Sequence, residues 1–200
     1  IDYSALVNYY SYDYCLPIAR QIVTALAEYG RDTRRDRIEM AMKFVQDIPY
    51  AVPNFDDDQW FFGGCIPPPM VMLCMRGDCD SKAALFASIL VHLIDARDII
   101  LLHTTNHVLS AVTDNYTIGT YIPFQGRNYF LAETAGPRRC ALGERGRFYV
   151  EGYRPEVLNL NDRRLISPIP YSRSTAIAAN TRRSDYSSSR TNTGSSSYGN

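Results

Sequence analysis

The chain has 200 residues with 21 basic and 21 acidic side chains, so no net charge draws it to nucleic acid or to an anionic membrane surface. No apolar run reaches the roughly 20 residues that span a bilayer, and we expect no membrane insertion. This length suffices for one domain with a sizeable core, and five cysteines are too few, and odd in number, for a disulfide scaffold.

Two helices are predicted in the N-terminal part. Apolar residues recur at helical spacing from Pro17, a residue suited to a first helical turn, until Gly30 ends the run. A second helix follows Asp32 or Thr33 as its cap, and Pro49 stops it. Because the connection is short, we expect the two helices to pack as a hairpin.

The segment 50–74 has the composition of an ordered loop of the kind that carries function. It contains consecutive aspartates at 56–58, aromatic residues at 60–62 and consecutive prolines at 67–69. Cys65 and Cys74 flank the prolines and could pair in an oxidising compartment, a point that the sequence leaves open.

Cys79 stands where a polar turn runs into an apolar helix. A thiol at a helix N-terminus has free backbone N–H groups and the positive end of the helix dipole beside it, which favours the thiolate. Gly77 permits a close approach, and Asp80 or Ser81 can cap the helix. The alternative is a small buried hydrophobe, as most free cysteines are. The flanking aspartates and glycine are unlike a core and favour the reactive reading.

An antiparallel sheet is predicted after this helix. Strands alternate with turn residues, and the first two form a hairpin that presents His107. The expected strands cover 98–103, 107–113, 120–123, 129–133 and 148–153. An order of helices first and an antiparallel sheet second is typical of the α+β class. We expect the cysteine-bearing helix to pack on one face of the sheet.

The composition changes near residue 172. From there the chain is rich in Ser, Thr, Asn, Arg and Gly, and after Ala179 no aliphatic residue remains that could be buried. We therefore expect a domain over 1–171, and a disordered tail or linker over 172–200 that leads to further domains of a longer chain.

Cys79, His107 and Glu133 follow one another in an order that suits acyl transfer. An imidazole can take the thiol proton, a carboxylate can fix the imidazole tautomer, and the backbone N–H of the cysteine can stabilise an oxyanion. A lone histidine on a strand is more often structural than catalytic, so the hypothesis of a catalytic His107 depends on all three residues together.

These residues resemble the transglutaminase-like superfamily, the compact bacterial branch of papain-like cysteine enzymes. The stretch Gly77–Leu90 looks like its nucleophile helix, Asn106–Val112 like its histidine strand and Tyr129–Thr134 like its acid strand. The resemblance implies a papain-like core with Cys79 as nucleophile, His107 as base and Glu133 as orienting acid. Glu133 departs from the family pattern, where the acid is more commonly aspartate.

Two points remain open at the site. The sequence does not identify the second hydrogen-bond donor to the oxyanion, for which Gln59 and Trp60 are the candidates. The rival chemistry is zinc, held by cysteine and histidine. Positions 103 and 107 of a continuous strand would lie about 13 Å apart, too far for one ion unless a turn intervenes. The candidate ligands for this reading are Cys65, Cys74, Cys79, His103 and His107.

The sequence thus favours a cofactor-independent cysteine enzyme that acts on amide bonds of a protein or peptide through a thioester. With water as acceptor it would be a peptidase or amidase, and with an amine a transglutaminase. Hydrolysis is favoured because the chain is small and has no recognisable calcium loop. The alternative is a catalytically silent module of the same fold that binds or supports other parts of a larger protein.

Overall fold

The structure is a computed structural model that describes residues 1–52, 64–115, 118–147, 149, 151–165 and 167–171. Helices come first in the chain. Within the described residues they are α1 (Tyr3–Tyr10), a π-helical segment (Ser11–Cys15), α2 (Leu16–Glu28), α3 (Arg34–Gln46), α4 (Pro68–Cys74) and α5 (Cys79–Leu90). Short 3-10 helices (Ala96–Asp98 and Arg163–Leu165) stand before and after the strands.

The strands form one sheet in which each neighbouring pair is antiparallel. Its order is β3-β4-β2-β1-β5, with β1 (Ile99–His103), β2 (Val108–Thr113), β3 (Tyr121–Phe124), β4 (Arg127–Ala132) and β5 (Arg154–Val157). Gln125 and Gly126 join β3 to β4 with φ of 48° and 74°, as a tight hairpin turn requires. The predicted α+β class is confirmed.

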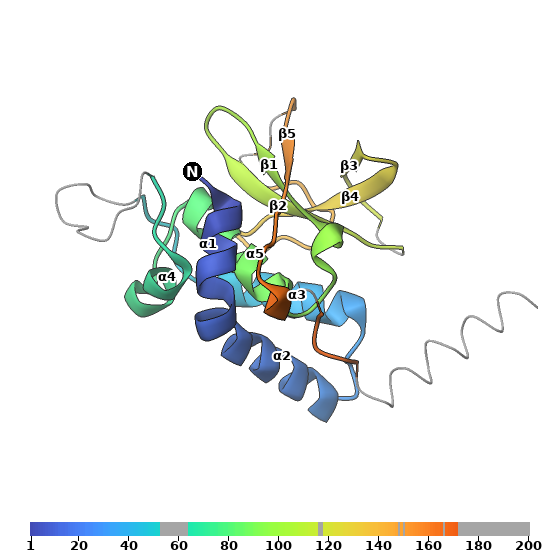
Figure 1. Ribbon diagram of the computed structural model, residues 1–200. Coiled ribbons are helices and arrows are strands. Elements are labelled where there is room, and N and C mark those ends of the chain that lie inside the picture. Colours follow the sequence, from blue (N-terminus) through green and yellow to red (C-terminus); the bar gives the residue numbers. More distant parts are fainter. Residues whose placement is uncertain (53–63, 116–117, 148, 150, 166, 172–200) are drawn as a thin grey trace, which may run out of the picture.

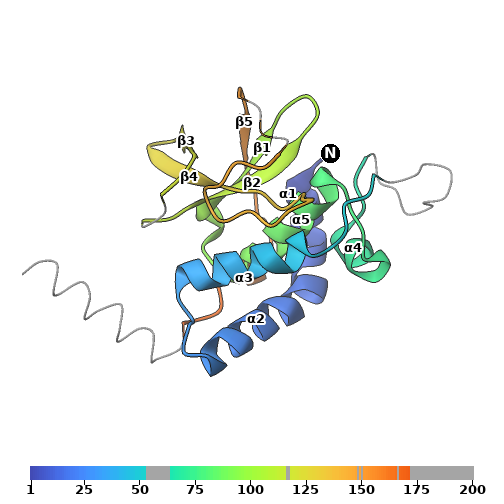
Figure 2. The ribbon, with the colours of Figure 1, turned by 180° about the vertical axis from the view of Figure 1, so that it is seen from behind.

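Helix α5 lies between the sheet and the remaining helices (Figure 1). It packs on β2 and is flanked by α1, α3 and α4, while α3 separates α2 from the sheet when the molecule is seen from behind (Figure 2). Residues 81–90 are all buried, which explains why α5 is apolar on nearly every side. The predicted packing of the cysteine-bearing helix on the sheet is confirmed.

Both faces of the central strands are covered. Along β1, Ile99 and Leu101 belong to the main core with the helices, whereas Ile100 and Leu102 belong to a smaller cluster on the other face. This alternation follows from the two-residue period of a strand. Segments after β4 supply part of the second cover, including Tyr149.

Thr33 caps α3, and Asp32 has a different role. The Thr33 side chain accepts from the backbone N–H of Asp36, whose carboxylate in turn accepts from the backbone of Thr33. Asp32 instead pairs with Arg37 at 2.5 Å, both side chains being fully buried. Of the two capping residues that the sequence suggested, Thr33 is the one that caps α3.

Other predictions need correction. The sequence reading assigned no structure before Pro17, yet α1 and the π-helical segment occupy that stretch. It assigned residues 50–74 to a loop, although α4 begins at Pro68 and ends at Cys74. The last strand is 154–157 rather than 148–153, of which residues 148 and 150 lie outside the described part.

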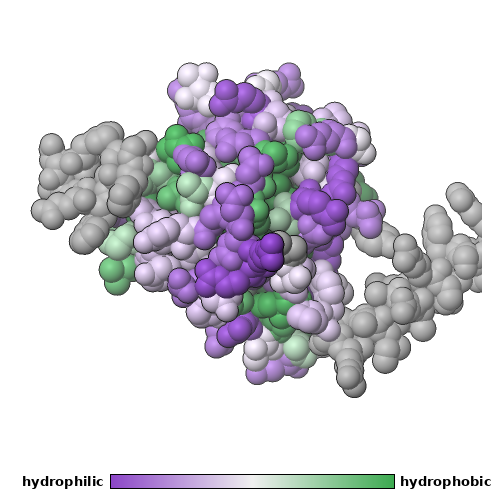
Figure 3. Space-filling view, viewed as in Figure 1, coloured by the Kyte–Doolittle hydropathy of each residue, from purple (hydrophilic) through white to green (hydrophobic). Residues whose placement is uncertain are grey.

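No helix among the described residues is long and apolar enough to cross a membrane. On the face seen in Figure 3, polar residues predominate, and apolar ones gather in small separated groups.

Candidate active site

Cys79 is the first residue of α5, and the turn before it is tightly fixed. Asp78 is the N-cap, and its carboxylate accepts from the backbone N–H of Ser81 at 3.0 Å and from its hydroxyl at 2.5 Å. Gly77 forms an isolated parallel bridge with Tyr50, and a Cβ at Gly77 would lie 3.2 Å from the Cβ of Ser81. The cysteine is therefore held by a rigid element.

His107 immediately precedes β2 and is buried. Its carbonyl accepts from the backbone N–H of Thr104 at 2.9 Å, which closes the turn between β1 and β2. The backbone N–H of the next residue, Val108, donates to the sulfur of Cys79 and lowers the pKa of that thiol. The start of β2 thus brings His107 to the N-terminus of α5.

Glu133 follows β4 directly and is buried beside His107. Its Oε2 lies 2.8 Å from Nε2 of His107, and its Oε1 accepts from the backbone N–H of Ala135 at 2.8 Å. A Cβ on Gly146 would lie 2.5 Å from Cγ of Glu133 and 2.7 Å from Oε2. Glycine at 146 therefore leaves the space that this longer acid needs.

Half-buried Gln46 and buried Lys82 connect the turn after β4 to the helical layer. Gln46, at the end of α3, donates to the carbonyls of Glu133 at 2.7 Å and Cys140 at 2.9 Å. Lys82, one turn into α5, donates to the carbonyls of Ile48 at 2.7 Å and Ala135 at 3.1 Å. The acid is thereby tied to the same helix that carries the thiol.

The electrostatics of Cys79 correct one expectation. Burial raises the pKa of the Cys79 thiol to about 12, and the carboxylates of Asp80 and Asp78 act in the same direction. These effects exceed that of the Val108 N–H and favour the thiol, the opposite direction from the one that the helix N-terminus led us to expect. The aspartates that distinguished Cys79 from a core residue are part of the cause.

Two tyrosines near the thiol were missed by sequence reasoning. The hydroxyl of Tyr50 hydrogen-bonds with Cys79, and burial and the negative groups around it raise the pKa of Tyr50. Tyr3 is buried in α1, and its hydroxyl hydrogen-bonds with Asp80 and lowers the pKa of that carboxyl, against the larger effect of burial. Tyr50 follows the predicted helix end at Pro49 and could have been suspected. Nothing in the sequence around Tyr3 links it to residue 80.

The remaining candidates are placed as follows. Gln59 and Trp60 lie outside the described residues. All five cysteines are free thiols, including Cys65 and Cys74. In the part of the chain that the structure describes, no three His, Cys, Asp or Glu side chains gather as a metal site would require. His103 lies 2.9 Å from Glu156 and packs against the ring of Tyr3, with 5.3 Å between centroids.

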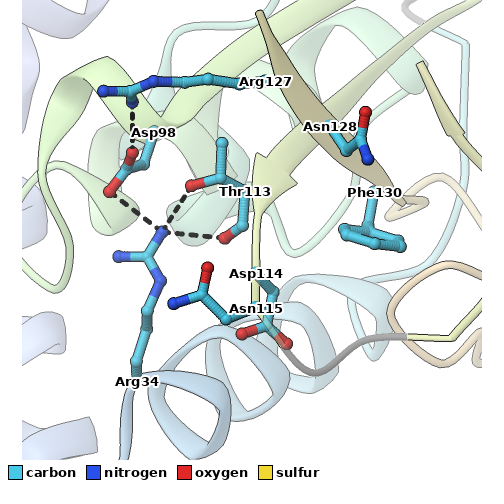
Figure 4. A pocket seen from close by; sticks show the side chains of 8 residues that line it. All are labelled: Arg34, Asp98, Thr113, Asp114, Asn115, Arg127, Asn128 and Phe130. Carbon is cyan, nitrogen blue, oxygen red and sulfur yellow. Dashed lines mark hydrogen bonds and ion pairs between the residues drawn. The ribbon is translucent and has the colours of Figure 1, made fainter. Parts of the chain in front are cut away.

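A polar cleft of about 670 Å³ opens at the other end of β2 (Figure 4). Arg34 donates to the carbonyl of Thr113 at 2.9 Å and lies 3.2 Å from Asp98, which Arg127 approaches to 2.7 Å. Asp98 thus pairs with both arginines of the lining. Because the cleft lining includes no thiol or imidazole, we place the candidate active site at Cys79.

Comparison with known proteins adds little. No protein-family model matches the sequence, and no curated protein matches it. Among solved structures, Legionella pneumophila LapG is similar at 15% sequence identity, with 70% of this chain and 78% of that chain covered and a TM-score of 0.36.

Proposed function

We propose that this protein is a cysteine-dependent enzyme that cleaves amide bonds of a peptide or protein through a thioester on Cys79. Two observations support the proposal: the buried hydrogen bond between His107 and Glu133, and the backbone N–H of Val108, the residue after His107, which donates to the sulfur of Cys79. The resemblance of the three motifs to the transglutaminase-like superfamily supports the same assignment.

The reaction begins at a neutral thiol. Glu133 accepts from Nε2–H of His107, which leaves Nδ1 as the nitrogen that takes the proton from Cys79 as its sulfur attacks the substrate carbonyl. The backbone N–H of Cys79 stabilises the oxyanion. The imidazolium then returns the proton to the leaving amine as the carbon–nitrogen bond breaks, and the acyl group remains on the sulfur. Water then releases the acid, as in a peptidase or amidase.

An amine in place of water would make the same site a transglutaminase. Both outcomes share every step up to the thioester, so the residues described here do not select between them. Hydrolysis is our first choice because water needs no binding site of its own.

A catalytically silent module is the second candidate function, and one observation favours it. The Cys79 thiol has its pKa raised to about 12, first by burial and then by Asp80 and Asp78. Nucleophilic cysteines usually sit in surroundings that lower the pKa of the thiol. A module that keeps the fold and the His107–Glu133 pair for structural reasons would tolerate such surroundings.

A substrate screen tests the proposal. We would incubate the protein with a peptide library and with glutamine-containing peptides plus a primary amine, and follow both products by mass spectrometry. Cleavage or amine incorporation that Cys79→Ala abolishes and Cys74→Ala leaves intact would support the enzyme, since Cys74 is an exposed thiol elsewhere on the chain. Turnover that survives Cys79→Ala would refute the proposed nucleophile.

A further inference from the structure

Lys82 is a fully buried cation on the helix that carries Cys79. A buried ammonium without partners would be costly, so its contacts define what it does in the fold. Its Nζ donates to the carbonyl of Ile48 at 2.7 Å and to that of Ala135 at 3.1 Å. These carbonyls belong to two separate segments, one after α3 and one after β4.

The second of these segments is the one that holds the acid. The backbone N–H of Ala135 donates to Oε1 of Glu133 at 2.8 Å, while the carbonyl of the same residue accepts from Lys82. Ala135 is therefore clamped between the carboxylate and the ammonium. The other oxygen of Glu133 lies 2.8 Å from His107, so a continuous chain of contacts links Lys82 to the imidazole.

We propose that Lys82 is a positioning residue, whose ammonium fastens the turn at Glu133 and Ala135 to α5 and so keeps the His107–Glu133 pair in register with the Cys79 thiol. Lys82 lies one helical turn from Cys79, on the side of α5 that faces this turn. A shift of the turn would move the carboxylate, and the imidazole would lose the bond that fixes its tautomer. The role in catalysis rests on the proposed function, whereas the role in orienting His107 does not.

Charge supports this role. Burial lowers the pKa of Lys82 to about 8, against the attraction of Glu133 and, to a lesser extent, of Asp47. The carboxylate of Glu133 thus stabilises the ammonium that fastens its own turn to α5.

Lys82→Met tests the proposal because methionine fills a similar volume without charge or donors. The control is Arg37→Met, which removes another fully buried cation whose carbonyl partners, at Ile169 and Pro170, lie outside the site. The probe is the imidazole nitrogen spectrum of histidine-labelled protein, which reports the tautomer of each of the three histidines without any substrate. His107→Gln assigns the signal of His107.

We expect the Nε2–H tautomer of His107 in wild type and in Arg37→Met, and a mixture of tautomers in Lys82→Met. On any substrate that the screen finds, kcat of Lys82→Met should fall by about 10²-fold with little change in KM, the size expected when a reacting group is misplaced. An unchanged His107 tautomer in folded Lys82→Met would overturn the proposal, even if stability had fallen.

A second measurement covers the case in which Lys82→Met does not fold. Lys43 and Lys82 are the only lysines in the chain, so lysine-labelled protein gives two titrating signals that Lys43→Arg assigns. Glu133→Gln should lower the pKa of Lys82, because it removes the anion that stabilises the ammonium. An unchanged Lys82 titration would show that the two groups do not interact and would overturn the proposal. If these measurements succeed while no substrate is turned over, the proposed function alone has failed.

Discussion

The family that the sequence resembles more commonly has an aspartate where this chain has Glu133. The surroundings of Glu133 accommodate its longer side chain. β4 ends at Ala132, so Glu133 lies just beyond the strand and its carboxylate turns back to meet the backbone N–H of Ala135. Gly146 lies against Cγ of Glu133, where the first atom of any side chain would collide. The spacing of residues alone does not reveal this fit, because it depends on a glycine distant in the sequence.

Glu133→Gln should keep the fold and remove most of the activity. The amide can favour the wrong imidazole tautomer, and the serine-protease precedent is a loss on the order of 10⁴ in kcat. Steady-state kinetics with circular dichroism as the fold check would measure it. Glu144→Gln, at an exposed acid, is the matched control and should leave kcat unchanged. Near-normal turnover by Glu133→Gln would remove Glu133 from the site.

The raised pKa of Cys79 makes a prediction about alkylation. Iodoacetamide is attacked at a methylene carbon rather than at a carbonyl, so we expect it to react with thiolate already formed, without proton removal by His107 during attack. At pH 7 it should therefore label Cys79 more slowly than the exposed Cys74, and the Cys79 rate should keep rising well above pH 9. Asp80→Asn removes a carboxylate that raises the thiol pKa and should speed labelling of Cys79. Mass spectrometry of partial labelling gives both rates. Faster labelling of Cys79 than Cys74 at pH 7 in wild type would show that the thiolate is favoured after all.

At the scale of elements, a buried histidine, His92, contacts the junction between α1 and α2. Ser11 begins the π-helical segment, and its carbonyl accepts from Nε2 of His92 at 3.0 Å. The Ser11 hydroxyl, 2.8 Å from the same nitrogen, donates to the carbonyl of Ser88 at 2.7 Å. Burial lowers the pKa of His92, so the junction is built around a neutral imidazole.

Stability should therefore fall in acid. Because the pKa of His92 is lower in the folded state than the unperturbed value of about 6.5, the unfolded chain takes up the proton first. The stability that His92 supports is complete above pH 6.5 and is lost as pH falls below it. His92→Gln keeps a donor but does not titrate, so its melting temperature should decline less between pH 7 and 5. Parallel declines in both proteins would place the acid sensitivity elsewhere.

Local patterns predicted part of these elements. The helical period and the flanking Pro17, Gly30 and Pro49 anticipated α2 and α3, and two largely apolar runs separated by turn residues anticipated β1 and β2. Helix α1 escaped because polar and tyrosine-rich residues blur its period. The short α4 was hidden by prolines that, at the start of a helix, are compatible with it.

The sequence predicted only part of the candidate site, because some of its contacts join segments that are distant in the chain. Cys79, His107 and Glu133 each stand at the end of an element, where local signals are strong. Tyr50, Lys82 and Gly146 act through contacts across the fold, and no spacing rule connects them with the acid or the thiol. The thiol pKa likewise depends on burial, which composition does not report.

At the scale of the whole molecule, Arg37 ties the C-terminal end of the described chain to the helices. Its guanidinium pairs with Asp32 and donates to the carbonyls of Ile169 at 2.5 Å and Pro170 at 2.8 Å. Its Cζ lies 3.9 Å from the ring centroid of Tyr171. The contacts reach Tyr171, and the domain end predicted at this residue stays a prediction.

Two truncations test this boundary. Ending the chain after Tyr171 should leave the melting temperature unchanged, because the sequence beyond it is mostly polar and has no aliphatic residue after Ala179. Ending it after Ser167 removes two acceptors from a buried charge, each bond contributing about 1.5–3 kcal/mol, and should lower the melting temperature by several degrees. Calorimetry of both proteins decides. Equal melting temperatures for the two truncations would show that the contacts between Arg37 and this segment do not contribute to stability.

Acylation of Cys79 tests the proposed chemistry most directly, because it needs no knowledge of the natural substrate. The protein would be treated briefly with p-nitrophenyl acetate, quenched in acid and mapped by peptide mass spectrometry. We predict an acetyl thioester on Cys79 that forms faster than on Cys74 despite the raised thiol pKa, because His107 removes the proton during attack. His107→Ala should abolish that advantage. Acetylation of Cys79 no faster than of Cys74, or unaffected by His107→Ala, would contradict a nucleophilic role for Cys79.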